Sequence, residues 1–397
     1  MTVNKDLSYV FNLSRQCLRL IGIWPDPYIS LNDFRWSRIR FMIAMSTISF
    51  YVFTPQIINV IRAWGNLIRM VELFVAANFS FMALCKLLAT RYYGDKLRTI
   101  IASVKTDWMT SKNDWERDTM LKIAKCGRFL SFRYFVATIG TIIFAITFYL
   151  DNTFYKSVNQ PRRNLAYRFD YIQKSPNYEI TFFIQLTGGA YAVLGNYTVD
   201  SFVSILVLHV CAQLINLRIA LSKLVDKLTN SFISSLTFKE GLTAIVERHE
   251  HLIRTAKTIN DCYSAVLFMH LLAAILQLCL ITFQVFTIIT NNISLPIIRM
   301  IFLLFYIYFV VMELYSYCYA AEKLLTESTL LAYGVFECKW YNLPPKDAQN
   351  LMLIVHRSNI PLRLTAGKFG NFSMELFGTA IRTSVGYVSA LLSITSQ

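Results

Sequence analysis

The sequence contains little charge. Aspartate, glutamate, lysine and arginine together make up 16% of its 397 residues, whereas soluble domains usually carry about 25%. Hydrophobic residues make up 55%, aromatic residues 15%, and the mean hydropathy is +0.43. So few charges beside so many apolar side chains indicate that much of the protein surface faces lipid rather than water.

A cleavable secretory signal is also missing. Residues 1–40 mix apolar and charged side chains, without a clean apolar core or a small-residue cleavage site. We therefore expect the amino terminus to stay in the cytoplasm. The first membrane crossing would then serve as its own insertion signal.

Signatures of enzymes and metal sites are absent from the sequence. There is no CxxC pair, no phosphate-binding loop and no hydrolase triad signature. His249 and His251 are two residues apart, so on a helix they point to different faces. No acidic cluster is evident within the apolar segments. We therefore predict that the chain is not an enzyme and binds no cofactor and no metal.

Seven runs of apolar residues are long enough to cross a bilayer, which requires about 20 helical residues. No internal repeat or soluble linker separates them. The sequence therefore predicts an all-α, seven-transmembrane-helix fold, in one membrane domain over residues 1–397. The expected spans are approximately 41–60, 70–90, 132–150, 180–213, 263–290, 297–321 and 373–394.

The fourth apolar run is longer than a membrane is thick. A continuous helix from Ile180 to Leu221 would reach about 63 Å, against about 30 Å of hydrocarbon. It must either project far beyond the membrane or be interrupted. Three glycines stand where an interruption would fall: Gly188, Gly189 and Gly195. The polar stretches 91–128 and 218–260 have helical spacing, and we predict that they form a cytoplasmic helical anchor region.

The distribution of basic residues predicts the orientation. Of the 39 lysines and arginines, 28 fall in the connections on the side of the amino terminus and 8 on the other side. By the positive-inside rule the amino terminus is inside and the carboxyl terminus outside. The basic residues flank apolar runs rather than forming one stripe, so nucleic acid is not an expected partner despite the net charge of +15. Asn292–Ile293–Ser294 is a glycosylation sequon on the outer side, but it lies close to the bilayer, and whether it is modified stays open.

The sharpest motifs lie near the carboxyl terminus. The exit of the sixth run contains Glu327–Ser328, Ala332–Tyr333 and Trp340–Tyr341. The last connection contains, in order, Arg357–Ser358–Asn359–Ile360–Pro361–Leu362, Leu364–Thr365–Ala366–Gly367–Lys368–Phe369, Ser373, Glu375, Phe377 and Thr383–Ser384. This region resembles the insect odorant receptor family, which carries a segment like RSxxPLxLTAGKF before its last helix. Over the first 300 residues the resemblance is mainly one of hydropathy.

The resemblance implies an odorant-gated, non-selective cation channel subunit in the plasma membrane of a sensory neuron dendrite. Its partners would be a volatile odorant, the co-receptor subunit in a heterotetramer, the lipid bilayer and the permeating cations. The chain lacks the long inner insertion of the shared co-receptor, so it resembles a ligand-specific subunit. The stretch from Thr383 to Tyr387 departs from the motif of the related gustatory receptors. The alternatives are a metabotropic seven-helix chemoreceptor and a gustatory-type ligand-gated channel.

The resemblance also implies where the sites lie. The family binds its odorant in the outer half of the membrane, in apolar pockets that often use aromatic residues. The candidates here are Phe74, Ala77, Phe144, Phe148, Tyr149, Tyr191, Phe305, Tyr306 and Phe309. The last helix would line the pore, with Ala390 and Ile394 at the gate, and the pore candidates are Thr383, Gly386, Ala390, Ser393 and Ile394. Arg382 is a charge inside that helix, and Glu375 lies two turns away on the same face, so this pair is expected to act either in subunit assembly or in conduction. The simpler interpretation of these small and aromatic residues is helix packing.

Overall fold

The structure is a computed structural model that describes residues 2–28, 30–111, 113–154, 165, 176–230, 232–290 and 297–395. The sequon at Asn292 lies outside the described residues. The described chain is almost entirely helical. Its elements are α1 Thr2–Ile21, α2 Leu31–Ser46, the π-helix η1 Thr47–Phe53, α3 Thr54–Arg62, α4 Leu67–Tyr92, α5 Gly94–Thr110, α6 Asp114–Phe154, α7 Asn177–Thr229, α8 Ser235–Thr290, α9 Ile297–Glu337, the 3-10 helix η3 Trp340–Asn342, α10 Pro345–Ser358, β1 Thr365–Ala366, β2 Gly370–Asn371 and α11 Met374–Thr395.

Six helical units within the described residues are long and apolar enough to cross a membrane. The first is continuous from α2 through η1 to α3, and the others are α4, α6, α7, α8 and α9. A seventh helix, α11, has 22 residues and packs against α8 and α9. With these six units and α11, the described chain has an all-α fold, as the sequence predicted.

Helix α7 forms the centre of the molecule. It contacts α1, α4, α6, α8, α9 and η1, and every residue from Gly195 to Gln213 is buried. It is continuous over 53 residues, or about 80 Å. Of the two alternatives, the interruption at the glycines is therefore excluded, and the continuous helix is longer than a membrane is thick. Gly188 serves a close approach, because a Cβ there would lie 3.1 Å from the carbonyl oxygen of Thr47 and 2.8 Å from Val52.

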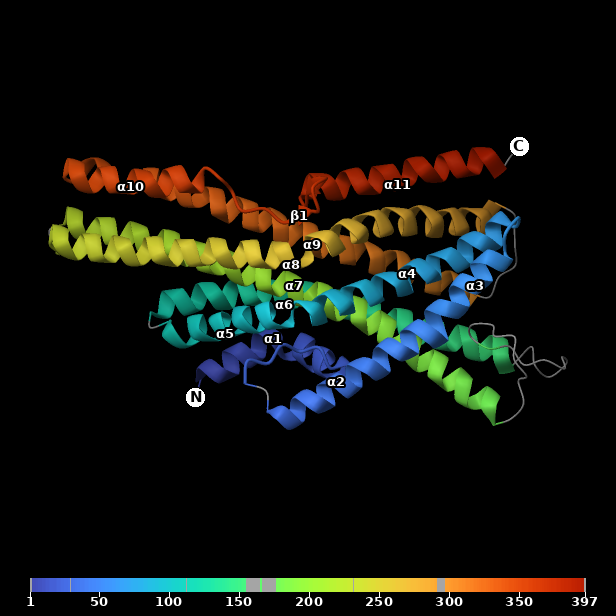
Figure 1. The fold of residues 1–397 in the computed structure, drawn as a ribbon. Helices are drawn as coiled ribbons and strands as arrows, with labels where there is room; N and C mark the ends of the chain where they lie inside the picture. The colour runs from blue at the N-terminus through green and yellow to red at the C-terminus, as the bar shows by residue number, and fades with distance from the viewer. Residues whose placement is uncertain are drawn as a thin grey trace.

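The polar stretches 91–128 and 218–260 are helical, as expected: the first forms mainly α5 and the beginning of α6, and the second forms the end of α7 and the beginning of α8. Their cytoplasmic location stays a prediction. One end of the molecule is formed by the carboxyl-terminal half of α7, the beginning of α8, the end of α9 and α10 (Figure 1). A separate apolar core holds this end together. It contains Leu217, Leu221, Val225, Phe238, Leu242, Ile245, Leu331, Val335, Cys338, Leu343, Leu351 and Ile354.

The carboxyl terminus lies at one end of the long axis, whereas the amino terminus lies in the other half of the molecule (Figure 1). The amino terminus and α5 lie toward the end that carries α10, whereas α11 runs to the opposite end. The short antiparallel pair of β1 and β2 stands between α10 and α11. It is attached to α8, because the Gly367 N–H donates to the Ser264 carbonyl (2.9 Å) and the Thr365 N–H donates to the Asn260 side chain (2.7 Å).

Candidate functional site

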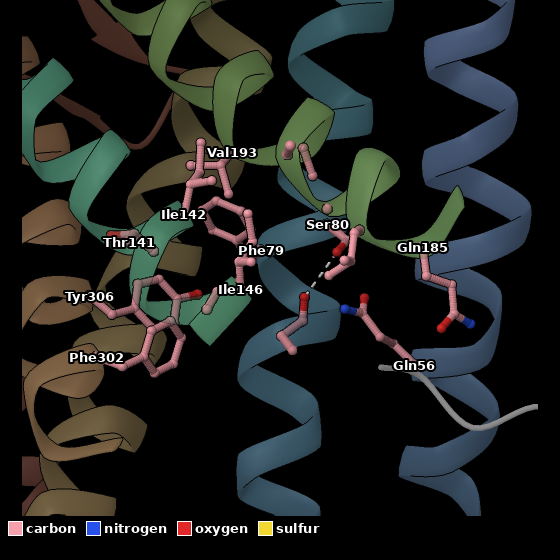
Figure 2. A pocket seen from close by; sticks show the side chains of 16 residues that line it. Gln56, Phe79, Ser80, Thr141, Ile142, Ile146, Gln185, Val193, Phe302 and Tyr306 are labelled. Atoms are coloured by element: carbon pink, nitrogen blue, oxygen red, sulfur yellow. Dashed lines mark hydrogen bonds between the residues drawn. The ribbon is translucent and has the colours of Figure 1, made fainter. Parts of the chain in front are cut away.

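A cavity of about 110 Å³ lies between α3, α4, α6, α7 and α9. Its wall is mostly apolar, and Figure 2 shows side chains entering it from all of these helices. The lining residues are Gln56, Ala76, Phe79, Ser80, Thr141, Ile142, Ala145, Ile146, Gln185, Leu186, Gly189, Ala190, Ala192, Val193, Phe302 and Tyr306. None of them is an acid, a lysine, an arginine or a histidine. The cavity therefore suits an uncharged, mainly apolar molecule.

Small residues leave the space open, and aromatic residues close one side of it. Four alanines and one glycine from three helices line the wall, and their small size leaves the centre open. On the α9 side, Tyr306 packs edge-on against Phe79 with ring centroids 5.7 Å apart. Phe302 lies beside Tyr306 at 5.9 Å. The site is thus a gap between small residues, bounded by a rigid aromatic group.

The irregular turn in the first membrane helix brings Gln56 into the cavity wall. A proline has no N–H and its ring clashes with the carbonyl four residues earlier, so Pro55 disfavours a regular α-helical turn. The chain adopts the wider π-helix η1 just before it, and the Thr54 hydroxyl donates to the Ser49 carbonyl at 2.8 Å. Gln56 follows and is 2% exposed. Such π-helical turns are frequent at functional sites.

Of the nine predicted pocket residues, the structure places only Tyr306 in the wall of this cavity. Ala77 and Phe309 are buried, and Phe309 packs edge-on against the wall residue Phe79. Phe305 and Phe144 pack on each other at 5.1 Å. Phe74 is exposed, Tyr191 is half-buried, and the side chains of Phe148 and Tyr149 lie outside the described part of the chain.

The candidates on α4 and the residues that line this cavity from the same helix lie on different faces. On α4 the wall is formed by Ala76, Phe79 and Ser80 rather than by Phe74 and Ala77. The prediction favoured large aromatic residues, whereas an open cavity requires small ones. Gln56 was missed altogether, and the only signal that could have found it was the proline one residue earlier.

A group of buried charges occupies the same helix bundle. The Lys86 ammonium on α4 donates to Asp200 on α7 (2.9 Å) and to Glu313 on α9. The side chains of Lys86 and Asp200 are 0% exposed and that of Glu313 is 3% exposed. Buried charges of this kind require partners and further hydrogen bonds. We call these three residues the ionic cluster.

Polar side chains from two more helices complete the ionic cluster. Tyr134 on α6 donates to Asp200 Oδ2 at 3.1 Å, and Tyr317 donates to Asp200 Oδ1 at 2.5 Å. His270 on α8 lies with its Nδ1 3.4 Å from Glu313 Oε1. Five helices therefore meet at one polar point. The expectation that no acidic cluster lies within the apolar segments is wrong, because its members stand singly in separate segments and only the fold brings them together.

Helix α11 has one packed face and one open face. Ala380, Ser384 and Val388 are buried, and the Ser384 hydroxyl donates to the Ile275 carbonyl of α8 (3.2 Å). Of the predicted pore residues, Gly386 and Ala390 are exposed and Thr383 is half-buried. The side chains of Ser393 and Ile394 lie outside the described residues.

The predicted assembly pair does not form a contact within the chain. Glu375 and Arg382 are both exposed, and the described residues contain no ion pair between them. Their charges therefore lie on a surface that is open to a partner or to solvent. The proposed assembly role stays a prediction.

A family model described as "7tm Odorant receptor" matches residues 66–385. This match covers most of the chain. The chain belongs to the odorant receptor family. Membership places it among receptors rather than enzymes, and it agrees with the resemblance carried by the carboxyl-terminal motifs.

Individual relatives share parts of the chain. Odorant receptor 13a of Drosophila melanogaster is 25% identical over 228 residues, which is 55% of this chain and 53% of that protein. The odorant receptor coreceptor of Aedes aegypti is 23% identical over 160 residues, which is 40% of this chain and 32% of the coreceptor. The matched part of the chain thus spans about half or less of these relatives.

The fold of the odorant receptor agrees with a solved structure over nearly its whole length. The insect olfactory receptor OR5 from Machilis hrabei, in complex with eugenol, matches with a TM-score of 0.82. The match covers 98% of this chain and all of that chain, at 14% sequence identity. At this identity, the likeness shows a shared fold alone.

Proposed function

We propose that this odorant receptor is a ligand-specific subunit of an odorant-gated, non-selective cation channel. Its membership of the family supports a receptor, and its coreceptor relatives support assembly with a co-receptor in a heterotetramer. The observation that carries the proposal is the apolar cavity beside Tyr306, whose wall has no acidic, lysine, arginine or histidine side chain and so suits a small volatile molecule. The proposed location is the plasma membrane of a sensory neuron dendrite.

We propose an inverted orientation, with the amino terminus inside. The excess of basic residues in the connections toward the α10 end supports it. The cavity would then lie in the outer half of the membrane, and the α7, α8, α9 and α10 anchor would stand in the cytoplasm. An epitope tag at the carboxyl terminus should stain intact cells, and staining of permeabilised cells alone would contradict this orientation.

The open face of α11 is the proposed pore lining. Small exposed residues such as Gly386 and Ala390 suit a narrow, water-filled path between subunits. Its other face is fixed to α8 through Ser384. Movement of α8 or α9 would therefore be passed to α11 directly.

The proposed mechanism is a shift of population between closed and open states. An odorant opens the channel only if it binds the open state more tightly than the closed state. The cavity lies between α4, α6, α7 and α9, and α9 also packs against α11. A ligand that changes the packing of α9 would therefore bias the pore helix.

The test is a recording of current from cells that express this chain with and without an insect co-receptor. G-protein signalling is blocked while a broad odour panel is applied. We expect fast cation current only when both subunits are present. A current abolished by the block would support a metabotropic receptor instead, and current from this chain alone would contradict the heteromeric assembly.

A further inference from the structure

Two polar atoms in the cavity wall are buried without a hydrogen-bond partner in the described part of the chain. One is the hydroxyl oxygen of Tyr306 and the other is the side-chain carbonyl oxygen of Gln56. Tyr306 is 7% exposed and Gln56 is 2% exposed. The two side chains enter from different sides of the cavity, with Phe79 and Ile146 between them (Figure 2).

The other hydroxyl groups of the wall differ from these two atoms. The Ser80 hydroxyl donates to the Ala76 carbonyl at 3.2 Å, and the Thr141 hydroxyl donates to the Ala137 carbonyl at 2.8 Å. Both are satisfied by their own helix. A buried polar group without a partner is costly, and such groups are rare in native proteins. A partner that enters the cavity would remove that cost.

The chemistry of the two atoms indicates which hydrogen-bonding groups such a partner carries. The Tyr306 hydroxyl carries a proton, which a hydrogen-bond acceptor on the ligand would satisfy, and the Gln56 carbonyl only accepts, so it requires a donor. The lining residues include no acid, lysine, arginine or histidine, so a charged ligand would be buried without a counter-ion. The ligand is therefore neutral.

The volume limits the size of the ligand. A cavity of about 150 Å³ in another protein accommodates benzene, which has six non-hydrogen atoms. The cavity here is about 110 Å³. A molecule of about this size fills it with little rearrangement of the helices.

We propose that the cavity selects small, neutral, mainly apolar molecules that carry a hydrogen-bond acceptor at one end and a donor at the other. This inference rests on the proposed function, because it specifies the ligand of the same cavity. The acceptor binds the Tyr306 hydroxyl, and the donor binds the Gln56 carbonyl. Apolar groups between them contact Phe79 and Ile146.

Four molecules of nearly equal shape and six non-hydrogen atoms each test this proposal. Hydroxybutanone, with its ketone and hydroxyl near opposite ends, has both functions. Pentanone, in the isomer that is a methyl ketone, has the ketone but lacks the hydroxyl. Isopentanol has the hydroxyl but lacks the ketone, and isohexane lacks both groups. Binding to the purified full chain is read from ligand-dependent thermal stabilisation, which measures affinity without requiring a current.

The expected order of affinity is hydroxybutanone first, the two single-function molecules next and isohexane last. Each matched function is expected to contribute about tenfold in affinity, as is typical for a hydrogen bond that satisfies a buried group. An equal or reversed order would overturn the proposal. So would a lack of stabilisation by all four.

Two variants test which side chain binds each end of the ligand. Tyr306→Phe keeps the ring and removes the hydroxyl. The affinity for hydroxybutanone should therefore fall about tenfold, to a value no higher than the affinity for isopentanol. Gln56→Met keeps the length and removes the carbonyl, so hydroxybutanone should bind no better than pentanone. Tyr308→Phe is the matched control, because Tyr308 lies on the same helix and is 41% exposed. Unchanged discrimination in Tyr306→Phe and Gln56→Met would overturn the assignment.

The two measurements distinguish failure of the proposed ligand class from failure of the proposed channel function. Ordered binding without any current in the co-receptor complex would support the ligand class and contradict the channel role. Current with no preference among the four molecules would contradict the ligand class alone.

Discussion

The cavity and the ionic cluster share helices α4, α6, α7 and α9, but they are built in opposite ways. The cavity wall consists largely of alanine, glycine and other apolar residues, with two polar atoms lacking partners. In the ionic cluster, the Lys86 ammonium has two partners and the Asp200 carboxylate has three, all of them side chains of other helices. One region is left incomplete for a molecule that enters from outside. The other is nearly complete within the chain and holds the helices in register.

The difference between the cavity and the ionic cluster indicates which contacts change during gating. Apolar contacts between small side chains are individually weak, so helices around the cavity shift at modest cost. A buried ion pair has few alternative partners in an apolar environment, and breaking it is strongly unfavourable. We therefore expect the ionic cluster to act as the fixed point about which the cavity rearranges.

The largest effect should follow removal of the only lysine in the ionic cluster. Lys86→Met leaves two carboxylates facing each other without a counter-ion, and we expect a loss of about 3–5 kcal/mol in stability. The receptor should then fail to reach the surface, as measured by surface labelling and thermal unfolding. Lys122→Met, on the exposed surface of α6, is the control. Normal stability of Lys86→Met would refute the idea of a fixed point.

A compensated variant sharpens that result. Adding Asp200→Asn and Glu313→Gln to Lys86→Met removes all three charges and leaves neutral hydrogen-bonding groups. Part of the lost surface expression should return, because replacing a whole buried ion pair is far less costly than breaking it. A combined variant that is worse than the single one would mean that the side chains act through their shape rather than their charge.

The next effect concerns the tyrosines that surround Asp200. Tyr317→Phe removes the hydroxyl that donates to Asp200 Oδ1 at 2.5 Å. A hydrogen bond to a charged group contributes about 1.5–3 kcal/mol, so the unfolding temperature should fall. Tyr315→Phe, two residues earlier, is the matched control, because that side chain is only half-buried. Equal shifts for the two variants would count against a specific role of the hydroxyl.

Filling the cavity should separate ligand sensitivity from stability. Ala145→Leu introduces three extra carbon atoms into the cavity wall. We expect the odour concentration for half-maximal current to rise about tenfold or more, which corresponds to about 1.4 kcal/mol, while surface expression stays near normal. Ile143→Leu, at an exposed position on the same helix, should change neither. An unchanged odour response in Ala145→Leu would place the binding site elsewhere.

The smallest effect is expected at an ion pair outside the buried interior. Arg299 at the start of α9 pairs with Glu72 on α4, and these side chains are 24% and 37% exposed. Partly exposed pairs contribute about 0–1 kcal/mol and are screened by salt. Glu72→Gln should therefore shift the unfolding temperature by little, and less at high salt. If Glu72→Gln lowered the stability as much as Lys86→Met does, the distinction between buried and exposed charges would be contradicted.

The sequence predicted the fold better than the site, and the reasons are physical. Each membrane helix has a local sequence signal, because about 20 consecutive apolar residues are enough to predict it. The faces of those helices depend on packing, so of these candidates Tyr306 lines the cavity while Phe74 and Phe144 do not. A cavity is marked by small residues such as Gly189 and Ala190, which carry little signal of their own.

The ionic cluster and Gln56 illustrate what a single sequence conceals. Lys86, Asp200 and Glu313 stand in three different apolar runs, and each alone looks like an isolated charge. Only the arrangement of α4, α7 and α9 shows that they meet. Gln56 depends on the π-helix η1, which moves its side chain out of the regular helical phase. Pro55 was visible in the sequence, but its effect on the next residue was not.

The central claim is that the cavity between Tyr306 and Gln56 is the odorant site, and a cryo-electron microscopy map tests it most directly. The full chain would be imaged with a co-receptor in lipid, with and without hydroxybutanone at a concentration that saturates thermal stabilisation. The account predicts ligand density between α4, α6, α7 and α9, in contact with the Tyr306 hydroxyl. Density only elsewhere, such as along the open face of α11, would contradict it.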